Sequence, residues 1–296
     1  MHPNTQNPAH ASGTLTLGGD LTVYRLGFGA MRITGEGIWG PPADKPNALA
    51  VLHRARELGI NLIDTANSYG PDVSEELIAE ALYPYANDLV IATKGGLLRT
   101  GPGEWPQDGR PESLRSALDG SLQRLRLERI DIYQFHRPDP KVPFEDSVGM
   151  LADLQKAGKI RHVGLSNVTI DELARAQKIV PIVTVQNHYN LAKRESERMS
   201  VADSEKLIDI CAEQGIGFIP WSPLAFGALA RPGSPLDAIA KAHDAKPSQV
   251  ALAWMLKRSP TMLPIPGTAS LQHLEENTAG ATLTLTQAEF DAINAQ

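Results

Sequence analysis

The chain has 296 residues, 42% hydrophobic and 21% charged, so it can bury a normal core in one large α/β domain or two smaller ones. The net charge of −6 and scattered basic residues argue against a nucleic-acid surface, and no apolar run reaches the ~18 residues of a membrane span. The single cysteine, Cys211, excludes a disulfide framework. Residues 1–13 carry no secretion signal, so we expect a flexible N-terminus there, one domain at 14–296 and a cytoplasmic location.

Strands and helices are predicted to alternate along the chain, with glycine or proline between them. Residues 15–24 predict a β-hairpin that turns at Gly18 and Gly19. Apolar runs predict strands at residues 26–31, 61–64, 89–94, 130–136, 160–166, 182–186, 216–221 and 262–265. Helices are predicted at residues 46–58, 74–82, 111–125, 146–157, 203–214, 247–257, 270–277 and 286–293, and a capping box at residues 169–172 opens another.

This alternation favours a closed (β/α)8 TIM barrel, with the N-terminal hairpin covering the bottom of the barrel. The alternative is an open, doubly wound parallel sheet. That fold usually carries a glycine fingerprint between its first strand and helix, and residues 35–40 do spell G-x-G-x-x-G. Pro41 and Pro42 follow at once and no helix opens there, so the match lacks its structural context.

Polar residues stand where the predicted strands end. Asp64, Lys94 and His136 end three strands, and Tyr69 lies five residues beyond Asp64. Active sites of (β/α)8 barrels lie at the carboxyl ends of the strands, so these side chains are expected to meet in one cup.

Together the four residues can handle a proton. A free tyrosine has a pKa of about 10, and a nearby ammonium such as Lys94 is expected to lower it. Asp64 would keep Lys94 charged and in place, while His136 could orient a carbonyl oxygen. The set predicts a general acid, Tyr69, tuned towards working pH. The eight histidines are dispersed, so no metal site is predicted.

Several motifs in the same order resemble the aldo-keto reductases over nearly the full length. They are Leu-Gly-Phe-Gly-Ala at 26–30, Leu-Ile-Asp-Thr-Ala at 62–66, Ala-Thr-Lys at 92–94, Ile-Asp-Ile-Tyr-Gln-Phe-His at 130–136, Gly-Leu-Ser-Asn at 164–167, Val-Gln-Asn-His-Tyr-Asn at 185–190, Trp-Ser-Pro-Leu at 221–224 and Ile-Pro-Gly-Thr-Ala-Ser at 265–270. The resemblance is closest to short-tailed bacterial members related to pyridoxal reductases. It implies reversible reduction of aldehydes or ketones with a reduced nicotinamide, with Asp64, Tyr69, Lys94 and His136 as the catalytic residues.

The resemblance also implies which residues hold the cofactor. They are Ala30, Met31, Ser166, Asn167, Gln186, Trp221, Ser222, Leu224, Gly267, Thr268, Ser270, His273, Glu276 and Asn277. Residues 267–270 open a helix, and a helix N-terminus is a good phosphate site on physical grounds alone. Many relatives carry a lysine at position 267 and an arginine at position 273 to read the ribose 2′-phosphate, and here both cations are replaced. NADPH is favoured, with NADH as the alternative.

Trp39 and Trp105 are the expected walls of an apolar substrate pocket, and pyridoxal is one candidate among aldehyde substrates. The chain ends at Gln296, just after its last predicted helix, so we expect a rather open pocket. The expected partner is a small carbonyl or alcohol substrate, with no nucleic acid or membrane, in a monomer or weak homo-oligomer.

Two other functions remain open. One is an aldolase that forms a Schiff base on Lys94, although a lysine beside Asp64 should stay protonated. The other is a nicotinamide-nucleotide-sensing module of the same fold that turns over slowly.

Overall fold

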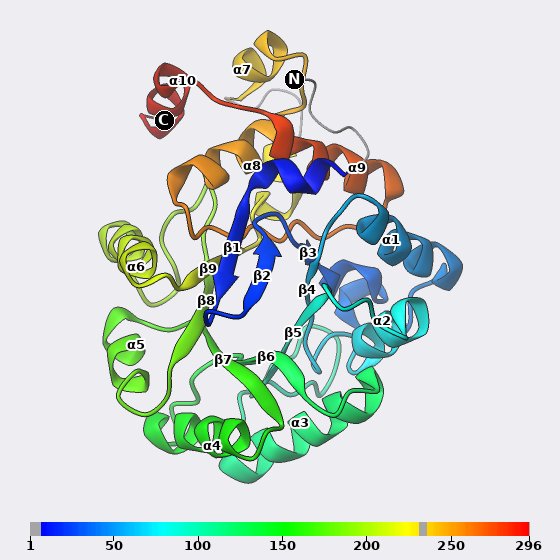
Figure 1. Cartoon of the computed structure of the whole chain (residues 1–296), viewed down its shortest axis with the longest axis vertical. Coiled ribbons are helices and arrows are strands. Elements are labelled where there is room, and N and C mark those ends of the chain that lie inside the picture. The colour runs from blue at the N-terminus through cyan, green and yellow to red at the C-terminus, as the bar shows by residue number, and fades with distance from the viewer. Residues whose placement is uncertain (1–6, 231–235, 296) are drawn as a thin grey trace.

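A curled sheet of seven parallel strands forms the centre of the protein (Figure 1). The computed structural model describes residues 7–230 and 236–295. The strands pair in chain order and are β3 (Phe28–Gly29), β4 (Leu62–Asp64), β5 (Val90–Gly95), β6 (Ile130–Phe135), β7 (Ile160–Ser166), β8 (Ile182–His188) and β9 (Gly217–Trp221). Parallel pairing in chain order around a closed core is the predicted barrel rather than the doubly wound alternative.

The predicted eighth strand at residues 262–265 closes the barrel without forming a regular ladder. Phe218 donates its backbone N–H to Thr261 and accepts one from Leu263, at 2.9 and 2.8 Å. On the other side, Gly27 N–H donates to the carbonyl oxygen of Pro264 at 3.0 Å. Proline has no N–H to donate, so Pro264 and Pro266 leave only an isolated bridge where a strand was expected.

The first barrel strand is also shorter than predicted. Only Phe28–Gly29 pairs with β4, and the expected continuation becomes the 3-10 helix η2 (Ala30–Ile33). This early bend turns the chain over the top of the barrel and brings Met31 and Arg32 to the mouth of the cavity described below.

Helices surround the sheet (Figure 1). They are α1 (Lys45–Glu57), α2 (Val73–Leu82), α3 (Pro111–Leu125), α4 (Phe144–Lys156), α5 (Ile170–Ala176), α6 (Val201–Gln214), α7 (Asp237–Ala242), α8 (Pro247–Arg258), α9 (Leu271–Ala279) and α10 (Gln287–Asn294). Short 3-10 helices are η3 (Glu36–Ile38), η4 (Ala225–Ala230) and η5 (Gly280–Thr282). The capping box predicted at Thr169 and Glu172 does open α5. Helix α7 was not predicted.

The N-terminal hairpin, β1 (Thr14–Leu17) and β2 (Leu21–Tyr24), lies across one end of the barrel, as predicted (Figure 1). Its apolar side chains Leu17, Leu21 and Val23 join a cluster with strand residues such as Leu62 and Ile132. Burial of this face closes the bottom of the barrel to water.

Part of the segment expected to be flexible is instead packed. Residues 1–6 lie outside the described residues, but Pro8–Ser12 forms the 3-10 helix η1. Ala9 is fully buried and its N–H donates to Leu58, while the ring of His10 stacks on Tyr24 at 3.9 Å. These contacts fix η1 against the hairpin and α1.

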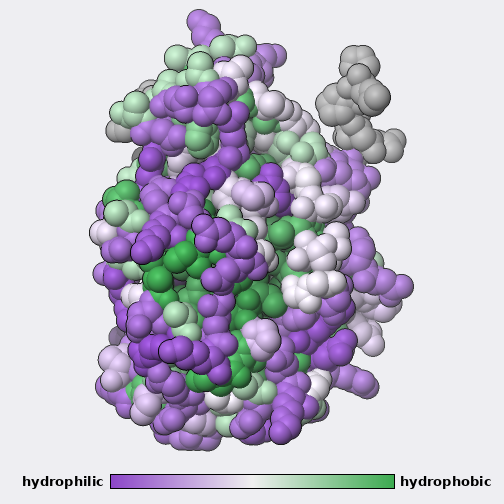
Figure 2. Space-filling model, turned by 60° about the vertical axis from the view of Figure 1, so that its left-hand side comes forward, coloured by the Kyte–Doolittle hydropathy of each residue, from purple (hydrophilic) through white to green (hydrophobic). Residues whose placement is uncertain are grey.

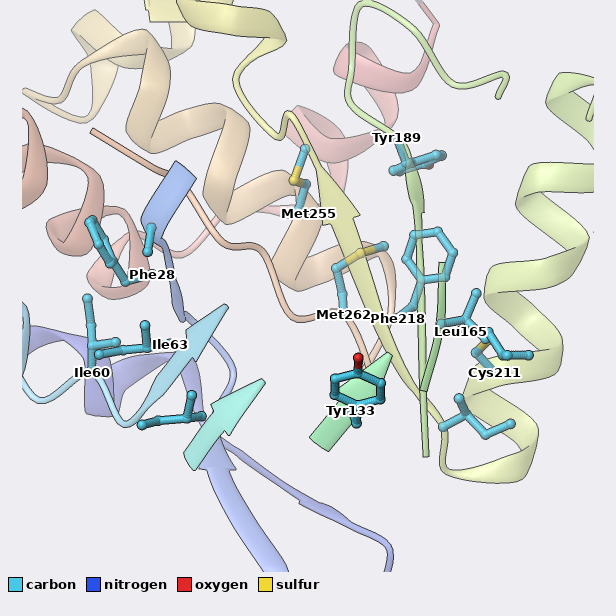
Figure 3. Close-up of a cluster of buried hydrophobic side chains, with 14 of the residues drawn as sticks. Phe28, Ile60, Ile63, Tyr133, Leu165, Tyr189, Cys211, Phe218, Met255 and Met262 are labelled. Atoms are coloured by element: carbon cyan, nitrogen blue, oxygen red, sulfur yellow. The ribbon is translucent and has the colours of Figure 1, made fainter. Parts of the chain in front are cut away.

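A second apolar layer lies between the strands and the helices (Figure 3). Figure 3 shows Phe218 of β9, Leu165 of β7 and Cys211 of α6 pointing towards one another. Cys211 is fully buried, and burial raises the pKa of its thiol to about 12. A packing role for this cysteine, rather than catalysis, follows from its burial.

On the face shown in Figure 2, hydrophobic residues gather near the middle and hydrophilic residues surround them. The large hydrophobic side chains that remain exposed among the described residues are Tyr83, Leu98, Ile179, Val201, Phe226 and Leu271. In residues 7–230 and 236–295, none of the helices combines the length and the apolarity needed to cross a bilayer.

Candidate active site

The residues that face the barrel axis change from apolar to polar along β4, β5 and β6. Every second residue of a strand faces the same side, so Leu62 of β4 is followed by Asp64 and Ala92 of β5 by Lys94. In β6 the same alternation places Gln134 beside Lys94 in the sheet register. The apolar layers fill the barrel, and the polar layer lies at the carboxyl ends of the strands.

Lys94 is at the centre of this polar layer and has no exposed surface. Its ammonium donates to Oδ1 of Asp64 at 2.5 Å, to the carbonyl oxygen of Thr65 at 2.8 Å and to the hydroxyl of Tyr69 at 3.3 Å. All three donor hydrogens of the ammonium therefore have an acceptor. The prediction that Asp64, Tyr69 and Lys94 meet agrees with this geometry.

The second carboxylate oxygen of Asp64 accepts two side-chain amides. Nε2 of Gln134 lies 2.9 Å from Oδ2, and Nε2 of Gln186 lies 2.8 Å from it. Gln186 was expected to contact the cofactor, and in this structure it contacts Asp64. Gln134 was missed, although its alternation with Ile132 on β6 could have placed it in the polar layer.

Burial outweighs the lysine in setting the state of the phenol. Desolvation raises the pKa of Tyr69, Lys94 opposes that rise, and Asp64 adds to it. The net direction is upward, which is opposite to the predicted tuning towards working pH. Desolvation lowers the pKa of Lys94, but the Asp64 carboxylate outweighs it, so the net shift of the Lys94 pKa is upward. Both groups hold their protons at neutral pH.

His136 lies edge-on to Tyr69, with ring centroids 5.9 Å apart. Burial first, and then the charges of Lys94 and Arg137, hold its pKa well below the ordinary histidine value. Nδ1 lies 3.4 Å from the hydroxyl of Ser68. His136 is therefore a neutral imidazole that can donate or accept one hydrogen bond in the cavity.

The four residues open into a cavity of about 770 Å³ at the top of the barrel, and all but Lys94 line it. Predicted cofactor residues that also line it are Met31, Ser166, Asn167, Gln186, Trp221, Ser222, Leu224, Gly267 and Thr268. Asn167 connects two of the elements: its Nδ2 donates to the carbonyl oxygen of His136, and its Oδ1 accepts from the indole of Trp221 at 3.1 Å.

A second cavity of about 880 Å³ shares Gly227, Gly267 and Thr268 with the first. The remaining predicted adenosine contacts, His273, Glu276 and Asn277, line this second cavity. The two cavities therefore adjoin at these residues, and together they reach from the polar layer to α9; this pair of cavities is called the nucleotide groove below. Such a shape suits an elongated dinucleotide.

Besides the fully buried Lys94, three predicted site residues lie outside both cavities. Ala30 is buried, and its carbonyl oxygen accepts from Ser74. Ser270 caps α9 by accepting the N–H of His273 at 3.3 Å. Trp39 forms an isolated backbone bridge to Gly70, and of the two predicted tryptophans only Trp105 lines the main cavity.

The glycine at position 267 has a steric reason. A Cβ there would lie 2.4 Å from the carbonyl oxygen of Gly29. The loop after residue 265 crosses β3 so closely that a side chain at this position would require the backbone to move. In this chain the crossing therefore favours glycine at position 267.

Arg99 was also missed, and it connects the loops around the pocket. Its guanidinium donates to backbone carbonyls of three loop segments, at Gly37 and Ile38, at Ser68, and at Gly101 and Glu104. It also lies 3.7 Å from the ring centroid of Trp105 and 5.3 Å from that of Trp39. Nothing in the local sequence distinguishes this arginine from a solvated one.

Within the described part of the chain, His, Cys, Asp and Glu side chains nowhere gather in a group of three that could hold a metal ion. The polar layer contains one carboxylate, one ammonium, one phenol and one neutral imidazole. This set can hold and transfer a proton beside a bound carbonyl group.

Sequence comparisons identify relatives along the full length. Residues 25–296 match the model of the aldo/keto reductase family. An uncharacterised oxidoreductase of Schizosaccharomyces pombe is 52% identical over 282 residues, which cover 95% of this chain and 89% of that protein. Pyridoxine 4-dehydrogenase of Escherichia coli is 42% identical over 284 residues, covering 94% of this chain and 96% of that protein.

Solved structures share the fold. Glycerol dehydrogenase from Gluconobacter oxydans superposes with a TM-score of 0.82 at 27% identity, over 96% of this chain and 95% of that one. An aldo/keto reductase from Klebsiella pneumoniae in complex with NADP and acetate has a TM-score of 0.76 at 25% identity, over 95% and 94% of the two chains. The match at 25–296, together with the relatives at 52% and 42% identity, shows that this chain belongs to the aldo/keto reductase family.

Proposed function

We propose that the protein reduces aldehydes and ketones to alcohols with NADPH, reversibly, and that Tyr69 is the general acid. The observation that carries the proposal is the ammonium of Lys94, which lies between the carboxylate of Asp64 and the hydroxyl of Tyr69 beneath the cavity. When bound, the reduced nicotinamide supplies hydride to the carbonyl carbon.

The chain's own residues supply the proton and the orientation. Tyr69 holds a proton at neutral pH and gives it to the carbonyl oxygen as the alkoxide develops. Lys94 stabilises the phenolate that remains, since its charge lies 3.3 Å from the hydroxyl. Neutral His136 donates a hydrogen bond that fixes the carbonyl oxygen near Tyr69.

The nucleotide groove, made of the two adjoining cavities, supports the cofactor assignment. Ser166, Asn167 and Trp221 lie at its inner end and would hold the nicotinamide, while Glu276 and Asn277 lie at its outer end and would hold the adenosine. The Klebsiella relative crystallised with NADP supports NADPH rather than NADH. Because positions 267 and 273 lack the usual cations, we propose that recognition of the 2′-phosphate depends on other groups that line the second cavity.

Pyridoxal is our first substrate candidate among aldehydes. It rests on the 42% identity to the protein named pyridoxine 4-dehydrogenase. Trp105 gives the cavity an aromatic wall that a pyridine ring could pack against.

The Schiff-base alternative is disfavoured by the buried pair. An amine must lose its proton to attack a carbonyl, and Asp64 keeps the pKa of Lys94 raised. The nucleotide-sensing alternative differs from the enzyme only in turnover, so kinetics must decide it.

The test is NADPH oxidation with 4-nitrobenzaldehyde and with pyridoxal, for the wild type and Tyr69→Phe. We expect turnover in the wild type and a loss of about 100-fold or more in kcat for the variant, with NADPH affinity unchanged. Full activity of Tyr69→Phe would remove the proposed acid. Tight NADPH binding without turnover would favour the sensing module.

A further inference from the structure

A cation at the mouth of the cavity has no role in the reaction described so far. Arg137 follows His136 directly and lines the main cavity and a smaller one of about 350 Å³ beside it. In the part of the chain that the structure describes, its Nε is buried and has no hydrogen-bond partner. A buried N–H without a partner is unfavourable, so the Nε side of the guanidinium is suited to an acceptor from outside the chain.

The present partner of Arg137 is weakly held. Nη1 donates to Oε2 of Glu197 at 2.8 Å, and the Glu197 side chain is 59% exposed. Ion pairs in contact with water are weak, so Glu197 can be displaced by a better-placed anion. Glu197 lines both cavities as well, and its removal would leave Arg137 without the carboxylate that it now pairs with.

The other charged residues of the main cavity are paired or placed elsewhere. The remaining charged residues that line it, within the described residues, are Arg32 and Asp64. Asp64 is engaged by Lys94, Gln134 and Gln186. Arg32 lies towards the nucleotide groove, near Gly267 and over the ring of Phe226.

We propose that Arg137 forms an anion subsite that receives a carboxylate or similar oxyanion carried by the carbonyl substrate. The inference rests on the proposed reductase function. Arginine suits this role because its planar fork matches a carboxylate and keeps its charge. Because Arg137 and His136 both line the main cavity, the subsite opens into the same space as the proposed site of the carbonyl oxygen. The preferred substrates are therefore aldehydes that bear an anionic group near the carbonyl.

The test compares 2-, 3- and 4-carboxybenzaldehyde with their methyl esters, which are neutral and nearly the same shape. In the wild type we expect kcat/KM to be about tenfold higher for at least one acid than for its ester, mainly through a lower KM. A ratio of about tenfold corresponds to one charge-assisted hydrogen bond. Arg137→Met should abolish that ratio, and Glu197→Gln should increase it. Arg110→Met, on an exposed arginine outside both cavities, should leave the ratio unchanged.

The ratio is taken within each variant, so a general loss of activity cancels. Equal acid and ester rates in the wild type, or an acid preference that survives in Arg137→Met, would overturn the subsite while leaving the reductase function intact. If the wild type reduces no acid or ester, binding of 4-(hydroxymethyl)benzoate and of its methyl ester to the NADP-loaded protein decides instead. Equal affinities of the two would then reject the subsite.

Discussion

The Lys94 ammonium lies 2.5 Å from Oδ1 of Asp64, and the two side chains have 0% and 2% exposure. Removing one residue of a charge pair that is so fully buried is costly, because the remaining residue keeps its charge without water or a counter-ion. The pair therefore bears on the stability of the fold as well as on the proposed proton transfer.

Removing one member of this pair should destabilise the protein strongly. We expect Lys94→Met to lower the free energy of unfolding by about 3–5 kcal/mol, because Asp64 is left buried with only amide donors. The double variant Lys94→Met with Asp64→Asn should recover part of that loss. Lys45→Met is the control: it breaks an exposed pair with Glu80 and should cost at most about 1 kcal/mol. Urea unfolding measures all four proteins, and equal losses for Lys94→Met and Lys45→Met would contradict the argument.

The neutral state of His136 predicts a pH dependence of stability. Its pKa is depressed in the folded protein by burial, then by Lys94 and Arg137, so below about pH 6.5 the unfolded chain binds a proton that the folded one does not. This contribution therefore destabilises the fold as the pH falls below that value and vanishes above it. The stability of the wild type should fall relative to His136→Gln, by at most about 1.4 kcal/mol per pH unit. Urea unfolding of both proteins from about pH 7.5 to 5.5, roughly one unit on either side of the reference pKa, makes the measurement. If the stability curves of the wild type and His136→Gln were parallel, the imidazole would titrate normally and the prediction would be wrong.

Arg99 is predicted to position the substrate loops. Arg99→Met removes hydrogen bonds to three loop segments and the contact with Trp105, so the wall beside Tyr69 should loosen. We expect KM for aromatic aldehydes to rise about tenfold or more, while NADPH affinity is unchanged. Arg175→Met removes a similar contact, with Phe144, and serves as the control because neither residue lines the main cavity. Steady-state kinetics and a fluorescence titration with NADPH make the measurement. A change in nucleotide affinity alone would contradict this role.

Gly267 is predicted to be required by the close crossing of two backbones. In Gly267→Ala the new Cβ would meet the Gly29 carbonyl oxygen at 2.4 Å, so the backbone must shift. We expect a loss of about 1–3 kcal/mol in stability and weaker NADPH binding. Gly149→Ala, in α4 with open space around the new Cβ, should instead stabilise by about 0.5–1 kcal/mol. Thermal unfolding of both variants measures the two changes in stability. If Gly267→Ala were as stable as Gly149→Ala, the two backbones would not be in tight contact at this crossing.

Much of the fold and of the proton-handling set could be predicted from the chain alone. Strand and helix alternation depends on local periodicity, and in a barrel all strands end at the same side, so Asp64, Lys94 and His136 had to approach one another. The hairpin followed from Gly18 and Gly19 and the apolar residues beside them. The prediction of a regular strand at residues 262–265 was wrong because Pro264 and Pro266 have no N–H to donate to a neighbouring strand. The two prolines could have been recognised in the sequence.

The remaining features depend on contacts between residues far apart in the chain. Arg99 reaches Ile38 across 61 positions, and Gln186 reaches Asp64 across 122, which no local pattern encodes. The direction of the Tyr69 pKa was mispredicted for the same reason, since the charge of Lys94 was visible in the sequence but the degree of burial was not. Local residue type determined which chemical groups end each strand. Only the tertiary structure decided their solvation and partners, because burial and hydrogen bonding depend on the neighbours that folding brings together.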